Sequence, residues 1–200
     1  MTFFRRFPLA IVIFSLPLMA GSAPGIKNFD QVDAQVYRGG QPTTEGFQHL
    51  AKLGVKTIID LREPGSRSIA EEKTVSSAGM KYVNIPMTGL AAPTEAEITK
   101  ILAILEDTSS GPVFVHCWRG ADRTGAVIGA YHIEHDSWDC ARALKDAKAH
   151  SMSSFQIPRR NYILNFQPRV VNAKASPGND VPVVPAAGSA SPAVQTAATN

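Results

Sequence analysis

Cysteine is scarce in this chain of 200 residues, which holds only Cys117 and Cys140. Two cysteines are too few for the disulfide framework of a small secreted domain, and their spacing does not match a zinc ribbon. Charged residues make up only 18% of the sequence, which is too little for a polyelectrolyte. The hydrophobic fraction of 44% is too high for a fully disordered chain. Composition therefore predicts one modest globular domain, whose chemistry depends on particular residues.

The apolar run near the N-terminus is too short for a membrane-spanning helix. It covers residues 7–20, about 14 residues against the roughly 20 that a span needs, and Pro17 interrupts it. Arg5 and Arg6 precede the run and small residues follow it, in the order of a secretory signal. No cysteine lies near the cleavage region, so a lipoprotein anchor has no attachment point. We expect residues 1–23 to be a signal peptide that directs export to the periplasm or beyond, with an uncleaved anchor as the alternative.

Residues 172–200 are rich in alanine, proline, valine and serine, and they carry almost no charge and no hydrophobic period. Such a segment predicts a disordered tail or linker and leaves residues 24–171 as the folded domain. Removing residues 1–23 deletes two arginines and leaves 18 basic residues against 17 acidic ones, a net charge of +1. The basic pI of the whole chain is thus no indication of nucleic-acid binding, and no nucleic-acid partner is expected.

Short β-branched runs alternate with helical patterns along the middle of the chain. Buried strands are predicted at residues 55–61, 81–86 and 112–116. One helix begins with a capping box formed by Thr94 and Glu97 and continues to about residue 105. The other predicted helices cover residues 44–53, 124–135, 137–150 (capped by Ser137) and 158–166. The alternation predicts an α/β fold with a central, mainly parallel sheet flanked by helices, and a ligand site at the carboxyl ends of the strands.

The clearest strand leads directly into residues 116–125, which read His-Cys-Trp-Arg-Gly-Ala-Asp-Arg-Thr-Gly. A loop between a strand and a helix N-terminus can turn its backbone N–H groups inward to bind a phosphate dianion. The same surroundings favour the thiolate form of Cys117. The loop residues expected to bind phosphate are Trp118, Arg119, Gly120, Ala121, Asp122 and Arg123.

Individual residues of this segment suit separate tasks. The planar guanidinium of Arg123 can hold two phosphate oxygens. The hydroxyl of Thr124 can stabilise the sulfur of Cys117 when it leaves, and His116 can hydrogen-bond to the loop backbone. Gly120 permits a tight turn, and Gly125 permits close helix packing. The plain alternative is a buried structural Cys117 beside a surface Arg123.

Residues 116–125 resemble the signature of the cysteine-dependent protein tyrosine phosphatase superfamily, which is His-Cys, five residues, Arg, then Ser or Thr. The wider region 36–166 resembles the compact dual-specificity branch, and its segments 36–42 and 57–62 are similar to those of bacterial and atypical members. No aromatic pocket-deepening loop stands at its expected N-terminal place. The resemblance implies a shallow site, open to phosphotyrosine, phosphoserine, phosphothreonine or non-protein phosphates.

The resemblance also implies a two-step reaction, in which Cys117 attacks phosphorus and water hydrolyses the phosphocysteine. No metal or other cofactor is expected, because Arg123 and the loop amides supply the positive field. In this family an aspartate on a nearby loop normally protonates the leaving oxygen as the general acid. This sequence departs from that pattern, since the loop 87–93 contains no aspartate. Asp60 and Asp122 are the two candidates, with Glu63 or no acid as further possibilities.

Each candidate acid has a structural alternative. Asp60 would then cap the end of its strand or pair with Arg62. Asp122 would then form an ion pair that orients Arg123.

Other residues are expected to be structural. His132, His135 and Asp136 share a predicted helix but have no identifiable third metal ligand. Arg119 is expected either to bind a second phosphate or to be solvated. Packing is expected for Trp118 and Trp138, with Trp118 also suited to form a rim of the pocket.

Two further features have an expected structural role. Arg159 and Arg160 are expected on a polar helix face. Cys140 is expected to be a small buried residue rather than a disulfide partner of Cys117.

The leading hypothesis is an exported, monomeric, metal-independent phosphatase that acts on a phosphorylated protein or a small phosphorylated molecule. Three alternatives remain open at this point. The first is the same chemistry on inositol phosphates or phosphoinositides, with Arg119 holding the extra phosphate. The second is a phosphate-binding module without turnover. The third is sulfur transfer through a persulfide on Cys117, which explains Arg123 and Thr124 less well.

Overall fold

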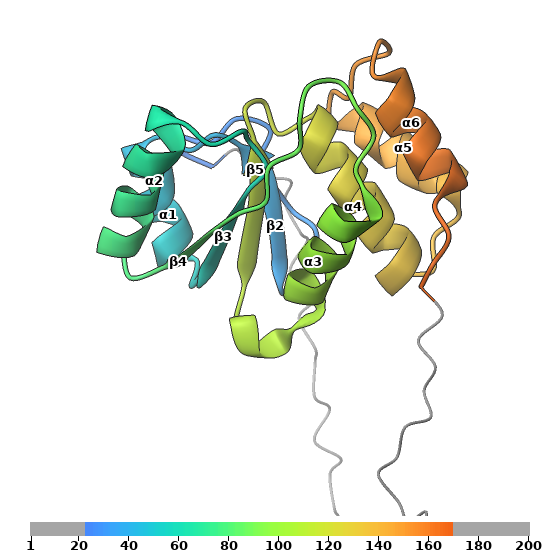
Figure 1. Cartoon of the computed structure of the whole chain (residues 1–200). Helices are drawn as coiled ribbons and strands as arrows, with labels where there is room; N and C mark the ends of the chain where they lie inside the picture. Colours follow the sequence, from blue (N-terminus) through green and yellow to red (C-terminus); the bar gives the residue numbers. More distant parts are fainter. Residues whose placement is uncertain (1–22, 170–200) are drawn as a thin grey trace, which may run out of the picture. The chain divides into compact units, whose positions relative to one another are not determined.

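The computed structural model describes residues 23–169 of the chain. The predicted disordered tail at 172–200 and, apart from Ala23, the predicted signal peptide lie outside the described residues. The described part is an α/β domain around one five-stranded sheet with the order β1-β2-β5-β3-β4 (Figure 1). The strands are β1 (Asp30–Gln31), β2 (Val36–Gly40), β3 (Thr57–Asp60), β4 (Lys81–Asn84) and β5 (Val113–Cys117).

Strand β5 lies at the centre of the sheet, parallel to β2 on one side and to β3 on the other. Strand β4 continues the parallel arrangement beyond β3, and only the short β1 pairs antiparallel. All five residues of β5 are buried, as a parallel strand covered on both faces requires. The predicted α/β fold with a central, mainly parallel sheet is therefore confirmed.

Helices cover both faces of the sheet, with α1 and α2 on one side and α3 to α6 on the other (Figure 1). Alternate strand residues explain this division, because Ile58 and Phe114 pack toward α1 and α2, whereas Ile59 and Val115 pack toward α3 to α6. The helices are α1 (Thr44–Lys52), α2 (Ser66–Ser77), α3 (Glu95–Glu106), α4 (Asp122–His135), α5 (Cys140–Ala149) and α6 (Ile157–Asn165), with a 3₁₀ turn η1 (Thr108–Ser110).

Local signals predicted most of these elements. The capping box of α3 is present, with Thr94 Oγ1 accepting from Glu97 N and Glu97 Oε2 accepting from Thr94 N. The expected Ser137 cap is wrong: Asp139 caps α5 by accepting from Arg142 N at 2.8 Å, and Ser137 lies in the connecting turn with φ +57°. Along residues 23–169, no helix combines the length and hydrophobicity that crossing a bilayer demands.

Strand β2 and helix α2 were not predicted. Strand β2 reads Val-Tyr-Arg-Gly-Gly and is buried throughout. Its central arginine and two glycines are not residues that predict a buried strand. Helix α2 is rich in serine and glutamate and buries only Ser68, Glu71 and Val75. Neither segment has the hydrophobic period from which elements are recognised.

Candidate active site

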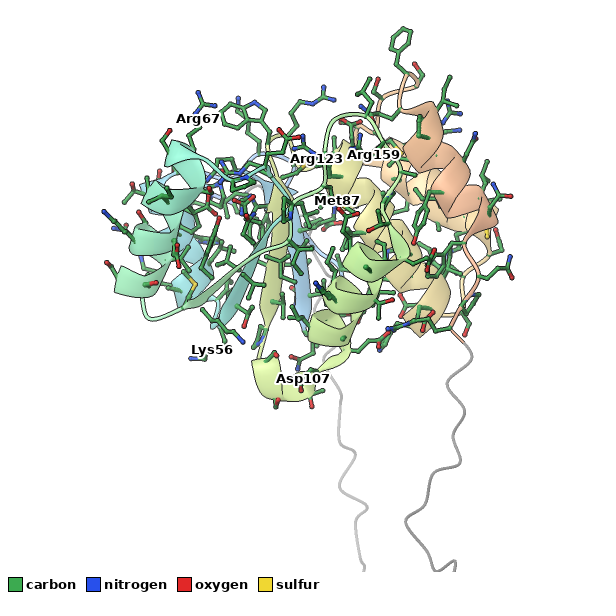
Figure 2. The ribbon with its side chains drawn as sticks, viewed as in Figure 1. Lys56, Arg67, Met87, Asp107, Arg123 and Arg159 are labelled. Atoms are coloured by element: carbon green, nitrogen blue, oxygen red, sulfur yellow. The ribbon has the colours of Figure 1, made fainter. Side chains whose placement is uncertain are left out.

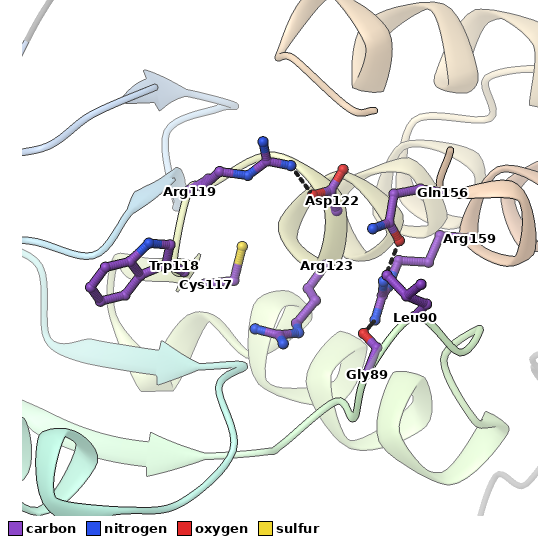
Figure 3. A pocket seen from close by; sticks show the side chains of 9 residues that line it. All are labelled: Gly89, Leu90, Cys117, Trp118, Arg119, Asp122, Arg123, Gln156 and Arg159. Atoms are coloured by element: carbon purple, nitrogen blue, oxygen red, sulfur yellow. Dashed lines mark hydrogen bonds and ion pairs between the residues drawn. The ribbon is translucent and has the colours of Figure 1, made fainter. Parts of the chain in front are cut away.

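The residues of the predicted phosphate loop line a cavity at the carboxyl end of β5. Strand β5 ends at Cys117, and α4 begins at Asp122 after a short loop. The cavity has a volume of about 170 Å³ (Figure 3). Its lining consists of Gly89, Leu90, Cys117, Trp118, Arg119, Asp122, Arg123, Gln156 and Arg159. The site thus lies where a parallel sheet was expected to hold it, with the N-terminus of α4 directed at it.

The loop owes its shape to a close contact with β2. Gly120 has φ +71°, and a Cβ atom there would lie 2.3 Å from the carbonyl carbon of Gly39. The Gly120 carbonyl oxygen accepts hydrogen bonds from Arg38 Nη2 at 3.0 Å and from Asn28 Nδ2 at 2.9 Å. Gly120 therefore has the conformational role predicted for it, and Arg38 and Asn28 are supports that the sequence did not reveal.

Two polar groups in the first turn of α4 have no partner within residues 23–169. Arg123 Nε and Thr124 Oγ1 are both buried and make no hydrogen bond there. Figure 3 shows the Arg123 side chain next to Cys117 in the wall of the cavity. Buried donors without partners are costly unless a ligand satisfies them, and an oxyanion is the ligand that a guanidinium and a helix N-terminus both favour.

His116 lies fully buried beneath the loop. Its Nδ1 is 3.3 Å from the carbonyl oxygen of Cys117, as the predicted supporting role requires. Its Nε2 lies 2.8 Å from Glu71 Oε1, which places a carboxylate of helix α2 against the ring. Glu71 is a supporting residue that the sequence did not reveal, because nothing in α2 distinguishes it from the adjacent Glu72.

The structure does not bring Asp60 to the cavity, which corrects its expected role as general acid. Asp60 is fully buried, and its carboxylate accepts from Arg62 Nε at 2.9 Å, Arg62 Nη2 at 2.7 Å and the Tyr82 hydroxyl at 2.7 Å. Burial opposes ionisation, but the bonds from Arg62, the charge of His116 and the bond from Tyr82 together hold the pKa of Asp60 below its usual value. Asp60 is thus the ion-pair partner of Arg62.

Asp122 does line the cavity, but its partner is not Arg123. Its Oδ1 accepts from Ser153 N at 2.9 Å, and its Oδ2 accepts from Arg119 Nη2. The bond to Asp122 raises the pKa of Arg119. The expected ion pair that orients Arg123 is therefore replaced by one that holds Arg119. Glu63 is exposed and accepts from Gly89 N at 3.2 Å, outside the lining of the cavity.

Arg159 is the main residue that sequence reasoning misplaced. It was expected on a polar helix face, yet it is buried and lines the cavity. Its Nη2 donates to the Gly89 carbonyl oxygen at 2.7 Å, and its Nη1 bonds to Gln156 Oε1 (Figure 3). Burial and then the positive charge of Arg123 lower the pKa of Arg159. Arg160, its neighbour, is half-buried, lies outside the lining of the cavity and donates to Ser154 O at 2.9 Å.

The remaining candidate residues lie away from the cavity or at its rim. Trp118 is exposed at the rim of the cavity, whereas Trp138 stacks on His132 at 3.8 Å. Asp136 is bonded to both His132 and His135. Gly125 packs closely, since a Cβ atom there would lie 3.0 Å from Met152 Cε.

Both cysteines are free thiols, and Cys140 lies against the carbonyl oxygen of Phe166 rather than beside Cys117. Within the described residues, one group has the composition of a metal site, namely Asp60, Glu71 and His116. The guanidinium of Arg62 pairs with both carboxylates of this group, so an internal cation already satisfies them.

Comparison with known proteins identifies the family of this chain. A family model described as DSP-PTPase phosphatase fused to NAD+ kinase matches residues 19–165. The chain is 29% identical over 119 residues to probable NAD kinase 2, chloroplastic, of Oryza sativa subsp. japonica, an alignment that covers 58% of this chain and 12% of that protein. It is 31% identical over 107 residues to inositol diphosphatase DSP5 of Arabidopsis thaliana, covering 51% and 52%. Thus the chain spans a small part of the first relative and about half of the second.

Solved structures show the same fold. The structure of TpbA from P. aeruginosa matches with a TM-score of 0.60 and 21% identity, over 72% of this chain and 92% of that one. The catalytic core of the PP-IP phosphatase SIW14 from S. cerevisiae matches with a TM-score of 0.62 and 24% identity, over 73% and 89%. Together with the match to the family model over residues 19–165, these findings confirm the resemblance seen in the signature. The chain therefore has the fold of these dual-specificity-type phosphatases, and it belongs to the family described as DSP-PTPase phosphatase fused to NAD+ kinase.

Proposed function

We propose that this chain hydrolyses phosphomonoesters through a phosphocysteine intermediate on Cys117, without a metal ion. The observation that carries the proposal is the position of Cys117 in a cavity that Arg123 also lines, with the buried Arg123 Nε and, in the first turn of α4, the buried Thr124 Oγ1 both lacking a hydrogen-bond partner within residues 23–169. A nucleophile, a fixed cation and a hydroxyl there meet at the N-terminus of α4.

The reaction follows from these positions. The substrate phosphate binds to the loop amides and Arg123, which stabilise the equatorial oxygens as charge shifts onto them. The Cys117 thiolate forms the S–P bond while the bond from phosphorus to the leaving oxygen breaks. Water then attacks phosphorus and loses a proton, the S–P bond breaks, and inorganic phosphate is released. The Thr124 hydroxyl, which has no partner within the described residues, would donate a hydrogen bond to the sulfur as it leaves.

The leaving oxygen has no obvious proton donor in this arrangement. Among the nine lining residues Asp122 is the single carboxylate, and both of its oxygens already accept hydrogen bonds from Arg119 and Ser153. Both oxygens therefore face hydrogen-bond donors of the protein rather than the leaving oxygen of a substrate. The site therefore suits leaving groups that depart as stable anions, such as the phenolate of phosphotyrosine, better than the alkoxides of phosphoserine or phosphothreonine.

A second candidate substrate class is a small molecule with several phosphates. The cavity is lined by three arginines, Arg119, Arg123 and Arg159, of which Arg119 is paired with Asp122 and exposes 60% of its side chain. A phosphate of an inositol phosphate or phosphoinositide that is not cleaved would find Arg119 at the rim. The relatives named inositol diphosphatases are consistent with this class.

The test is a substrate panel run on the wild type, on Cys117→Ser and on Cys140→Ser, which removes the other free thiol. Phosphotyrosine, phosphoserine and phosphothreonine peptides, inositol phosphates and phosphoinositides should be compared. We expect Cys117→Ser to abolish turnover and Cys140→Ser to preserve it, and acid-quenched wild type to carry phosphate on Cys117 by mass spectrometry. Activity that survives in Cys117→Ser would refute the mechanism, and a wild type inactive on every phosphate would favour a binding module.

We also propose that the protein is exported and monomeric. Arg5, Arg6 and the apolar run at residues 7–20 support export. N-terminal sequencing of protein recovered from the periplasm should start close to residue 24, and light scattering should give one chain per particle. Protein that keeps its N-terminus and stays in the cytoplasm would contradict export.

A further inference from the structure

Large exposed apolar side chains lie in the lining of the Cys117 cavity and next to lining residues in the chain. Within the described residues, the exposed fractions reach 65% for Leu90, 54% for Trp118, 86% for Phe155 and 58% for Ile157. Leu90 and Trp118 line the cavity, and Phe155 and Ile157 flank Gln156, which also lines it. These four residues are named here the apolar rim. Their exposure around a single opening is uncommon for a protein surface and marks a contact surface.

The most exposed part of the apolar rim projects outward and is held in place. The loop between α5 and α6, which carries Phe155, rises at the same end of the domain as the loop between β5 and α4 (Figure 1). Its backbone is anchored, since Ser153 N donates to Asp122 and Arg160 Nη1 donates to Ser154 O. A projecting apolar side chain is poorly matched to a rigid protein partner without a complementary pocket, but it inserts readily into a fluid apolar phase.

Arginines stand among these apolar side chains. The Arg67 guanidinium carbon lies 4.9 Å from the centre of the Trp118 ring, Arg119 exposes 60% of its side chain, and Arg160 lies at the base of the Phe155 loop. Figure 2 shows Arg67, Arg123 and Arg159 at one end of the domain, with Lys56 and Asp107 at the other. Asp122 is neutralised by Arg119, and Glu63, which binds Gly89 N, is the acidic side chain found beside Leu90.

We propose that the apolar rim and its arginines dock the mouth of the cavity onto an anionic lipid surface. Phe155, Ile157, Leu90 and Trp118 would enter the boundary between headgroups and acyl chains, while Arg67, Arg119 and Arg160 contact lipid phosphates. The phosphate of an amphiphilic phosphomonoester then reaches Cys117 directly from the surface. That last step rests on the proposed function, whereas the docking itself does not.

The two tryptophans of the chain provide a direct test. In full-length Trp138→Phe the emission comes from Trp118 in the rim, and in full-length Trp118→Phe it comes from Trp138, which follows the C-terminal end of α4 and stacks on His132. Each should be mixed with phosphatidylglycerol–phosphatidylcholine vesicles that contain brominated acyl chains. We expect the emission of Trp118 to shift to the blue and to be quenched, and that of Trp138 to change little. Equal quenching of both, or of neither, would overturn the proposal, even if another part of the chain binds the vesicles.

A second measurement does not depend on the tryptophan variants. Full-length Phe155→Ser/Ile157→Ser removes two rim side chains, and Leu53→Ser/Leu164→Ser is its control, since those exposed leucines lie outside the rim. We expect the rim variant to bind the vesicles at least about tenfold more weakly, because burying one large apolar side chain contributes more than the free energy of one decade in affinity. Equal binding by the two variants would overturn the proposal.

Activity separates failure of docking from failure of the proposed function. Both double variants should hydrolyse a small soluble aryl phosphate like the wild type, because none of the four residues lines the cavity. If the wild type hydrolyses no phosphomonoester, the proposed function fails while the quenching of Trp118 still decides the docking. A different result would identify a peptide as the partner. If the protein does not bind vesicles, but hydrolyses a phosphopeptide with apolar flanks at a rate that falls when Phe155 and Ile157 are replaced, the proposal is overturned.

Discussion

The guanidinium of Arg38 donates a hydrogen bond of 3.0 Å from Nη2 to the carbonyl oxygen of Gly120, joining a buried residue of β2 to the loop between β5 and α4. Its Nη1 lies 3.4 Å from Asp146 Oδ2. Burial lowers the pKa of Arg38 to about 10, against the opposing effects of Asp146, Asp30 and Cys117. Arg38 therefore stays charged at neutral pH and places a fixed positive charge beneath the loop that holds Cys117.

Replacing Arg38 should disturb both folding and catalysis. We expect Arg38→Met to lower the free energy of unfolding by about 2 kcal/mol, since buried partners lose their donor. We also expect kcat for an aryl phosphate to fall at least about tenfold, one decade for a loss of roughly 1.4 kcal/mol in the transition state. Arg38→Lys should recover stability better than kcat, because an ammonium group does not reproduce the fork that reaches both Gly120 and Asp146. The measurements are denaturant unfolding and steady-state kinetics, with Arg142→Met as the control. If the kcat of Arg38→Met stayed at the wild-type value, the role of Arg38 would be purely structural.

Gly120 should be intolerant of any side chain. Gly120→Ala adds a Cβ atom 2.3 Å from the Gly39 carbonyl carbon at φ +71°. Gly79→Ala is the matched control, since Gly79 has φ +75° but open space around it. We expect Gly79→Ala to cost about 1 kcal/mol through backbone strain alone, and Gly120→Ala to cost at least about 2 kcal/mol more and to reduce activity. Equal losses in thermal or chemical unfolding would show that the contact with β2 is unimportant.

The dependence on leaving group should reveal whether Asp122 donates a proton. Because both of its oxygens accept hydrogen bonds, we expect Asp122→Asn to slow aryl phosphates with good and poor leaving groups by the same factor. A general acid would behave differently, since its loss costs about 10²–10⁴ in rate and affects mainly the poor leaving group. The measurement is kcat for a series of aryl phosphates of increasing phenol pKa. A selective loss on the poorest leaving groups would establish Asp122 as the acid.

The stability of the domain should depend on the charge of His150. Its Nε2 lies 2.9 Å from Asp30 Oδ2, and its Nδ1 faces the carbonyl and carboxylate oxygens of Asp146. The bond to Asp146 raises the pKa of His150 above 6.5, while burial and the charge of Arg38 act in the opposite direction. Because the pKa is higher in the folded state, this stabilisation is complete below about pH 6.5 and disappears as the pH rises through the folded value.

The corresponding experiment compares the melting temperature of the wild type and His150→Gln on both sides of pH 6.5. We expect the wild type to lose its advantage as the pH rises, with the two proteins converging at alkaline pH. A difference in melting temperature that does not change with pH would contradict a charged His150 between the two aspartates.

Elements with a strong local signal were predictable. The capping box at Thr94 and Glu97 and the apolar strand before Cys117 depend on neighbours within a few residues, and both occur in the structure. Strand β2 and helix α2 have no such signal, because Arg38 and Glu71 are polar side chains buried by contacts with distant residues. Arg159 was misplaced for the same reason, since its partner Gly89 comes from a loop about seventy residues earlier.

By itself, the sequence determined the fold class and the identity of the reactive loop, because hydrophobic periods and the ten residues from His116 to Gly125 are local features of the chain. Only the tertiary structure decided which charged residues support that loop. It removed Asp60 from the cavity by pairing it with Arg62, it brought in Arg159, and it placed Arg38 under Gly120. The physical reason is that the ionic partners of a buried side chain depend on distance in space, which spacing along the chain does not encode.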